Sequence, residues 1–387
     1  MSSQRSIPTL DRISTLPDSV ICHILSFLPT KQSVTTTMIS KRWNPLWLSV
    51  LTLDFDDQNF SDFATFRHFI YSVMLTRHTT LPIQSLRLKC GVSSGCNPYD
   101  INRIVRAALQ RGIVNLILDF SYTDFDFQIG LSTTISSVFN CRNLVVLKLT
   151  CLTFTVVPQF NFPLLKTLHL DSVSFLGDQN EEFYKFVELC PILEELQTTN
   201  MQFWVSNDCD NGKYNKCFSN LVRAKICNLT WSWNVPFAWI CNAKFLHIEL
   251  SKEQKVHTFH NLTHFELIFK SVWQRKWNWL VELLEHCPKL QNLTLNQLYG
   301  HGFDKENWKE PKNVPECIFS QLRKCSFIAY EGKQCEFRFA EYILKSAKVL
   351  RTMTINASLV DINLKHQMLR DLSLCPRGSA TCKLSFD

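Results

Sequence analysis

Leu144-Val-Val-Leu147-Lys-Leu149 is one copy of a pattern that decides the fold, and Leu165-Lys-Thr-Leu168-His-Leu170 is the next copy. The first, fourth and sixth positions of the pattern are apolar. Side chains alternate along a β-strand, so Leu147 and Leu149 are predicted to point into a core while Val146 and Lys148 face the opposite way. The remaining copies follow the same rule, except that Thr198 ends the fifth: Ile83-Leu86-Leu88, Ile113-Leu116-Leu118, Leu193-Leu196-Thr198, Leu221-Ala224-Ile226, Ala243-Leu246-Ile248, Leu262-Phe265-Leu267, Leu290-Leu293-Leu295, Leu322-Cys325-Phe327 and Leu350-Met353-Ile355.

The spacing of these eleven copies identifies the repeat. Consecutive copies are 19 to 32 residues apart, and most steps lie in or just beyond the range of a leucine-rich repeat. One such unit cannot bury its own apolar side, so neighbouring units must stack to complete a core. We therefore predict an α/β solenoid over residues 51–300, a curved parallel sheet with its helices outside and polar side chains on the concave face.

Composition limits the classes of protein that the chain can belong to. The chain has 387 residues, of which 45% are hydrophobic and 19% charged, so a disordered protein is excluded. The net charge of +7 is not concentrated in any basic cluster, and nucleic-acid binding is not expected. The chain begins with a polar stretch, and no apolar run approaches the ~18 residues of a membrane-spanning helix, so we expect neither secretion nor membrane insertion.

The sixteen cysteines are expected to be reduced. They are scattered singly, and no Cys-x-x-Cys pair is present. Buried thiols in the cytoplasm or nucleus fit this distribution better than a disulfide framework. No zinc spacing, phosphate-binding glycine loop or nucleophile motif occurs, so we expect no metal, no cofactor and no catalytic site.

Residues 9–50 do not follow the repeat and are predicted to form three helices. The first opens at Leu16-Pro17, where proline suits the first turn, and carries one apolar stripe made of Ile21, Ile24, Leu25 and Leu28. Pro29 ends it, and Thr30 can cap a second helix. The third carries Ile39, Trp43 and Trp47 on one face. About forty residues cannot bury so many large side chains alone, so these either meet a partner protein or cap the first repeats.

The same segment resembles an F-box. The resemblance is carried by Leu16-Pro-Asp-Ser-Val-Ile-Cys-His-Ile-Leu-Ser-Phe-Leu-Pro29, followed by Ser40-Lys-Arg-Trp43 and by Trp47. F-boxes bind the Skp-type adaptor of cullin–RING ubiquitin ligases. The resemblance implies adaptor contacts from Leu16, Pro17, Ile21, Ile24, Leu25, Leu28, Pro29, Trp43 and Trp47.

The C-terminal region carries a second resemblance. Trp308, Pro311, Val314-Pro315, Tyr330-Glu-Gly332 and Glu336 are similar to an FBD domain, as is the ending from Pro376 to Asp387. F-box, repeats and FBD in this order resemble the plant F-box/FBD/LRR-repeat proteins. We expect a flexible segment over residues 1–8, the F-box over 9–50, the repeats over 51–300 and the FBD domain over 301–387. Lys345-Ser346-Ala347 departs from that family, in which an Asn-Ala pair is more usual.

A tryptophan-rich segment leaves two interpretations open. Trp231 and Trp233 alternate in an extended segment and would anchor a partner if they lie on the concave face. In the other interpretation these rings, with Phe237, Trp239, Trp277 and Trp279, belong to the helix-side core.

The expected function is therefore a non-catalytic substrate receptor. The F-box would bind the adaptor, and through it a cullin, while the repeats and the FBD domain hold a target protein of unknown identity. Two alternatives stay open at this point: a sensor whose small ligand recruits the target, and a scaffold without ligase coupling.

Overall fold

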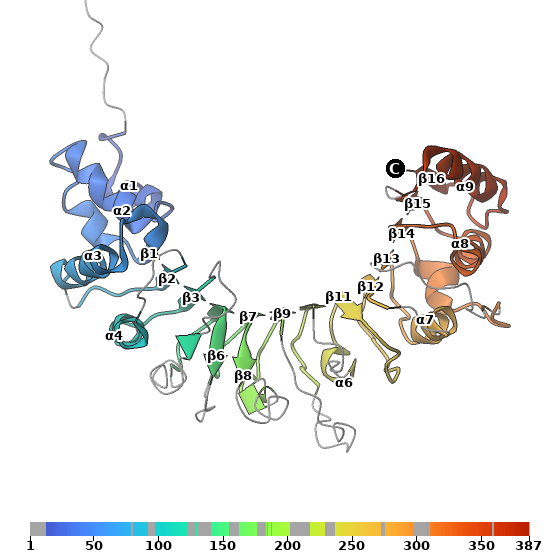
Figure 1. Ribbon diagram of the computed structural model, residues 1–387, viewed down its shortest axis with the longest axis horizontal. Helices are drawn as coiled ribbons and strands as arrows, with labels where there is room; N and C mark the ends of the chain where they lie inside the picture. Colours follow the sequence, from blue (N-terminus) through green and yellow to red (C-terminus); the bar gives the residue numbers. More distant parts are fainter. Residues whose placement is uncertain are drawn as a thin grey trace, which may run out of the picture. The chain divides into compact units, whose positions relative to one another are not determined.

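The computed structural model describes residues 13–78, 80–91, 97–121, 129–130, 141–154, 162–175, 183, 185–186, 188–201, 217–228, 237–271, 275–297, 308, 310–357 and 360–386 (Figure 1). The chain forms two compact units. The first runs to Leu165 and includes Phe175, and the second contains Lys166–Ser174 and most of the remaining chain. Residues 1–8, the expected flexible segment, lie outside the described residues.

The first unit begins with short helices. They are α1 (Asp18–Leu25), α2 (Thr30–Thr35) and two 3₁₀ turns, η1 (Thr36–Met38) and η2 (Leu46–Ser49). The predicted third helix is not continuous, because Pro45 has no N–H to donate within it and instead precedes η2. The predicted cap at Thr30 is also wrong. Its hydroxyl accepts a hydrogen bond from the backbone N–H of Asp54 at 2.8 Å, while Pro29 precedes the helix.

Parallel strands follow in the first unit. Their order is β1 (Thr52–Asp56), β2 (Ser85–Lys89), β3 (Asn115–Asp119) and β5 (Val146–Thr150), with short β4 (Ile129–Gly130) paired to β6 (Leu152–Phe154). The pattern leucines are in register, Leu86 beside Leu116 and Leu116 beside Leu147. Beyond the turn η3 (Asp57–Asn59), helices α3 (Phe63–Thr76) and α4 (Pro98–Leu109) lie along the same side of these strands (Figure 1).

The second unit is built in the same way from more strands. Their order is β7 (Thr167–Asp171), β9 (Glu195–Thr199), β10 (Arg223–Cys227), β11 (Phe245–Leu250), β12 (His264–Phe269), β13 (Asn292–Gln297), β14 (Lys324–Ile328), β15 (Thr352–Ile355) and β16 (Lys383–Phe386). All of these neighbours pair in parallel. The remaining elements of this unit are α6 (Phe237–Ile240), α7 (Lys276–Glu285), the π turn η5 (Cys317–Gln321), α8 (Gln334–Ser346) and α9 (Ile362–Leu374). The two-residue strand β8 (Ser174–Phe175) is divided between the units.

The eleven copies of the pattern all form strands, from β2 to β15. Within these strands the predicted inward positions are buried and the positions between them are half-buried or exposed, as at Leu147 and Leu149 against Val146 and Lys148. In the second unit α7, α8 and α9 lie on one side of the strands, which leaves the other face without helices (Figure 1). The parallel sheets and their one-sided helices agree with the predicted α/β class. Strands β1 and β16 were not predicted: β1 carries the pattern as Val50, Leu53 and Phe55, a copy that was overlooked, whereas in β16 the first position is the polar Thr381.

Strand ends in the second unit are joined by a polar chain of hydrogen bonds. Asn200 and Asn228 follow β9 and β10 with backbone φ of 53° and 51°, a left-handed conformation that asparagine tolerates well. The Asn200 amide donates to the Asp171 carboxylate at 2.8 Å, and the Asn228 amide donates to Asn200 Oδ1 at 3.0 Å. Lys270 Nζ then donates to Asn228 Oδ1 at 3.3 Å. These side-chain bonds link the ends of β7, β9, β10 and β12 beyond their backbone pairing.

A dense aromatic core closes the C-terminal part of the second unit. Phe339 of α8 is fully buried, with its ring centroid 4.9 Å from that of Trp277 and 5.5 Å from that of Trp308. The buried Glu336 carboxylate accepts hydrogen bonds from the backbone N–H groups of Glu331 at 3.0 Å and Gly332 at 2.9 Å. Burial raises the pKa of Glu336 to about 7, against the lowering effect of those two bonds.

Candidate functional site

Large apolar side chains are left in water around the first helix. Val20 and Ile24 of α1, Phe27 just after it, and Met38 and Ile39 at the end of η1 form what we call the N-terminal exposed set. Spacings of four and three residues place the first three on one face of a helix. Phe27 is 74% exposed and Met38 is 90% exposed. Burying a side chain of this kind is worth about 1.5–3 kcal/mol, so the set is suited to a protein partner.

The nine residues that the resemblance assigns to the adaptor have different surroundings. Pro17 and Ile24 are exposed, and Leu16, Leu28 and Pro29 are half-buried. The other four are buried beneath this chain's own segments: Ile21, Leu25, Trp43 and Trp47. Adaptor contact by the nine stays a prediction, and the buried four act on it through the shape of the helices that they hold.

Trp43 and Trp47 each have an identifiable hydrogen-bond partner. Trp43 Nε1 donates to the hydroxyl of Ser14 at 3.1 Å. The carbonyl of Trp47 accepts a hydrogen bond from the buried guanidinium of Arg77 at 3.4 Å. Arg42, next to Trp43, pairs with Asp18 at 2.6 Å and donates to the carbonyl of Leu16 at 2.7 Å. The segment before α1 is thus held against the turn that carries the first indole.

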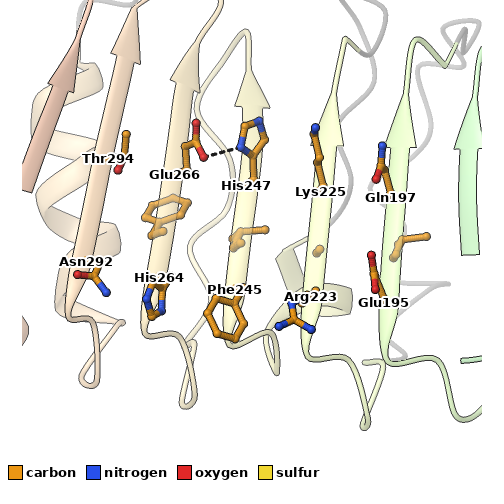
Figure 2. Close-up of a pocket in the computed structure, with 14 residues that line it drawn as sticks. Glu195, Gln197, Arg223, Lys225, Phe245, His247, His264, Glu266, Asn292 and Thr294 are labelled. Carbon is orange, nitrogen blue, oxygen red and sulfur yellow. Dashed lines mark ion pairs between the residues drawn. The ribbon is translucent and has the colours of Figure 1, made fainter. Parts of the chain in front are cut away.

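A groove of about 380 Å³ crosses the helix-free face of the second unit (Figure 2). It is lined by outward side chains of β9 to β13, in two rows that run across the strands. One row is Glu195, Arg223, Phe245, His264 and Asn292, and the other is Gln197, Lys225, His247, Glu266 and Thr294.

In the first row a guanidinium group and two aromatic rings lie next to one another. The Arg223 guanidinium lies 5.0 Å from the centroid of the Phe245 ring, which in turn lies 4.6 Å from the His264 ring. Partial burial, with the nearby Lys244 and Lys324, lowers the pKa of His264. His264 is therefore predominantly neutral at pH 7, so the fixed positive charge of this row comes from Arg223.

The two carboxylates of the groove lie within hydrogen-bond distance of histidine rings. His247 Nδ1 lies 2.7 Å from Glu266, and Glu195 lies 2.9 Å from His169 on β7. Within the part of the chain that the structure describes, Arg223 and Lys225 have no carboxylate partner. Two adjacent cations beside an aromatic ring are suited to a segment that combines a carboxylate with an apolar or aromatic side chain.

The tryptophans are divided between the core and the undescribed segments. Trp231 and Trp233, the predicted target-binding residues, lie outside the described residues. Phe237, Trp239, Trp277 and Trp279 are buried on the helix side, and the Trp279 indole donates to the carbonyl of Gln254 at 2.8 Å. For these four side chains the core interpretation holds.

Sequence reasoning missed the residues that line both surfaces. Phe27, Met38 and the groove residues were not singled out, although the alternation that placed Lys148 on the outer face also applies to Arg223 and Phe245. No metal site is formed by His, Cys, Asp or Glu side chains in the described ranges. Across those same ranges the helices are too short or too polar to span a bilayer.

Two family models match this chain, one towards each end of it. A family model of the F-box domain matches residues 13–53, and a family model named FBD matches residues 310–355. An FBD-associated F-box protein of Arabidopsis thaliana is 30% identical, over 97% of this chain and 100% of its own length. A probable FBD-associated F-box protein (28%) and an F-box/FBD/LRR-repeat protein (29%) of the same plant each match 98% of this chain over their full lengths.

Proposed function

The chain belongs to the family of FBD-associated F-box proteins, and from this premise we propose that it is the substrate-recognition subunit of a cullin–RING ubiquitin ligase. Its F-box binds a Skp-type adaptor, which connects it to a cullin scaffold. The described cysteines are thiols, which fits a reducing compartment such as the cytoplasm or nucleus.

The N-terminal exposed set supports adaptor binding most directly. A short helical module that keeps Phe27 and Met38 almost fully in water pays for this with a loss of hydrophobic stabilisation. A partner that covers these side chains restores the lost hydrophobic stabilisation. The same module buries the indoles of Trp43 and Trp47, which gives it a packed core, so little ordering entropy is lost when the partner binds.

The groove across β9 to β13 supports the second half of the function. It presents fixed charges and rings on a regular sheet, away from the helices. A target held there has its lysines kept near the ubiquitin-loaded enzyme at a high effective concentration. In this role no group of the chain itself makes or breaks a covalent bond.

A binding measurement with the Skp-type adaptor tests the first half. We expect Phe27→Asp/Met38→Asp to weaken adaptor binding by at least 100-fold, because two charges would be buried in an apolar contact. Leu75→Asp is the matched control, since Leu75 is 85% exposed on α3 of the same unit and lies outside the F-box match. Retention of the adaptor by the double variant, or no retention by the wild type, would overturn the proposal.

The second half is tested by proximity labelling in cells with the proteasome blocked. Arg223→Glu/Lys225→Glu should remove the proteins that accumulate around the wild type while leaving the adaptor bound. Lys348→Glu/Arg351→Glu makes the same change in charge at exposed positions outside the groove. Equal labelling by both double variants would show that the groove does not select the target.

A further inference from the structure

Two cysteine sulfurs of the second unit lie in direct contact. Cys217 Sγ and Cys241 Sγ are 2.8 Å apart, and both side chains are half-buried. Cys217 lies just before β10 and Cys241 just before β11. Their surroundings are ordered by a backbone hydrogen bond of 3.0 Å from the N–H of Phe218 to the carbonyl of Trp239.

The two thiols have different chemical surroundings. The Asn242 amide donates a hydrogen bond of 3.2 Å to Cys217 Sγ. Burial, followed by the contact with Cys217, raises the pKa of Cys241 to about 12. Cys217 is therefore the better nucleophile, and Cys241 is held beside it as a thiol.

Cys217 is also within reach of small molecules. It lines a hollow of about 230 Å³ together with Pro191, Ser219 and Cys190, whose own thiol is fully buried. A water molecule in the liquid occupies about 30 Å³, so a molecule of hydrogen peroxide fits in this space. Cys241 does not line the hollow.

Other cysteines of the second unit have structural roles instead. The thiols of Cys190 and Cys287 are fully buried, and each donates to the carbonyl four residues earlier, at Phe186 and Leu283. Cys317 donates to the carbonyl of Leu284. Satisfied thiols in such apolar surroundings are inert.

We propose that Cys217 and Cys241 form a reversible disulfide when the chain meets a hydroperoxide. The Cys217 thiolate attacks one peroxide oxygen, the O–O bond breaks, and a sulfenic acid and hydroxide result. The sulfur of Cys241 then attacks Cys217 Sγ, the S–O bond breaks, and the departing oxygen takes the Cys241 proton and leaves as water. Overall, two thiols give two electrons to one peroxide, and the products are one disulfide and two waters.

The bond would connect the entries of two strands that line the groove. β10 carries Arg223 and Lys225, and β11 carries Phe245 and His247. A covalent link across 24 residues restricts the unfolded chain. The oxidised protein should therefore melt several degrees higher than the reduced protein.

Mass spectrometry of the full chain tests the proposal. The reduced protein is treated with hydrogen peroxide, free thiols are alkylated, and the protein is digested with trypsin, which yields peptides 217–223 and 226–244. We expect these two peptides to be linked with the loss of two hydrogen atoms, and to separate on treatment with dithiothreitol. Peptide 226–244 also holds Cys227, so fragmentation must locate the bond at Cys241. No link, or a preferred link to Cys227 or Cys209, would overturn the proposal.

Variants separate the two chemical steps. Cys241→Ser should stop the reaction at the sulfenic acid of Cys217, which dimedone traps, and should abolish the rise in melting temperature. Cys227→Ser is the matched control, and we expect it to form the 217–241 bond as the wild type does. If dimedone labels Cys241 in Cys217→Ser as strongly as it labels Cys217 in Cys241→Ser, the assigned order of attack is wrong.

Discussion

The F-box and the FBD region differ in how far they expose apolar side chains: Met38 of the first is 90% exposed, whereas Phe319, the most exposed large apolar side chain of the second, is 50% exposed. Over residues 13–53 the chain keeps Phe27 and Met38 in water and buries the indoles of Trp43 and Trp47. Over residues 310–355 it buries Phe339 completely and also encloses the carboxylate of Glu336. The first arrangement retains surface for a partner, and the second encloses a carboxyl group that accepts hydrogen bonds from the loop beside it. The F-box is therefore suited to contact with a partner, and the FBD region is suited to completing the hydrophobic core.

Removing one benzene ring from each region should give the largest difference. Phe339→Ala is expected to lower the free energy of unfolding by about 3–5 kcal/mol, because the ring packs against Trp277, Trp308 and Tyr342. Phe27→Ala should change it by less than about 0.5 kcal/mol, because the ring is 74% exposed. Urea denaturation of both variants measures the two values. Similar values would break the comparison.

The buried carboxylate should give the FBD region a pH dependence of its own. The pKa of Glu336 is raised from 4.5 to about 7, so its contribution to stability is fully present below 4.5 and is lost as the pH rises through 7. Glu336→Gln should therefore gain about 2 kcal/mol relative to wild type between pH 5 and pH 8. The measurement is chemical denaturation at both pH values.

A control variant separates the effect of burying a carboxyl group from the effect of removing a negative charge. Glu331→Gln removes one charge from the same loop, where Glu331 pairs with Lys333 at 2.8 Å. Its difference from wild type should stay nearly constant between the two pH values. A pH-dependent gain of equal size in both variants would contradict the role given to burial.

Two glycines with the same backbone conformation sharpen the comparison further. Gly332 of the FBD region has φ of 71°, and a Cβ there would lie 2.4 Å from Met368 Cε. Gly112 has φ of 81°, and a Cβ there would meet no atom within 4 Å. Alanine is strained in either position, but Gly332→Ala must also displace Met368, so we expect it to cost about 1 kcal/mol more than Gly112→Ala. Thermal unfolding of both variants is sufficient, and equal losses would show loose packing at Gly332.

The repeat could be predicted because its regularly spaced apolar residues are the ones that become buried. Leu147 and Leu149 occur with a spacing that only alternating side chains explain, and each copy of the pattern became a strand. Strand β1 was missed although Val50, Leu53 and Phe55 fit the pattern and are buried, and strand β16 was missed because polar Thr381 takes the first apolar position. The left-handed positions of Asn200 and Asn228 depend on neighbouring strands, which no single stretch reveals.

The candidate surfaces were only partly predictable for a related reason. The resemblance named Trp43 and Trp47 among the adaptor residues, yet a family pattern records both the side chains that touch a partner and those that support them. Separating the two requires the fold, which places Phe27 and Met38 outside and the indoles inside. Groove residues such as Arg223 and Phe245 share no motif, because they are brought together by register across strands.

The constant spacing between neighbouring strands gives the groove a defined width. Parallel neighbours are about 4.8 Å apart, so the four steps from β9 to β13 measure about 19 Å. An extended peptide rises about 3.3 Å per residue, and five or six residues laid crosswise would cover that width. Because backbone pairing between the strands sets this width, the connecting segments can change in length and sequence without altering it.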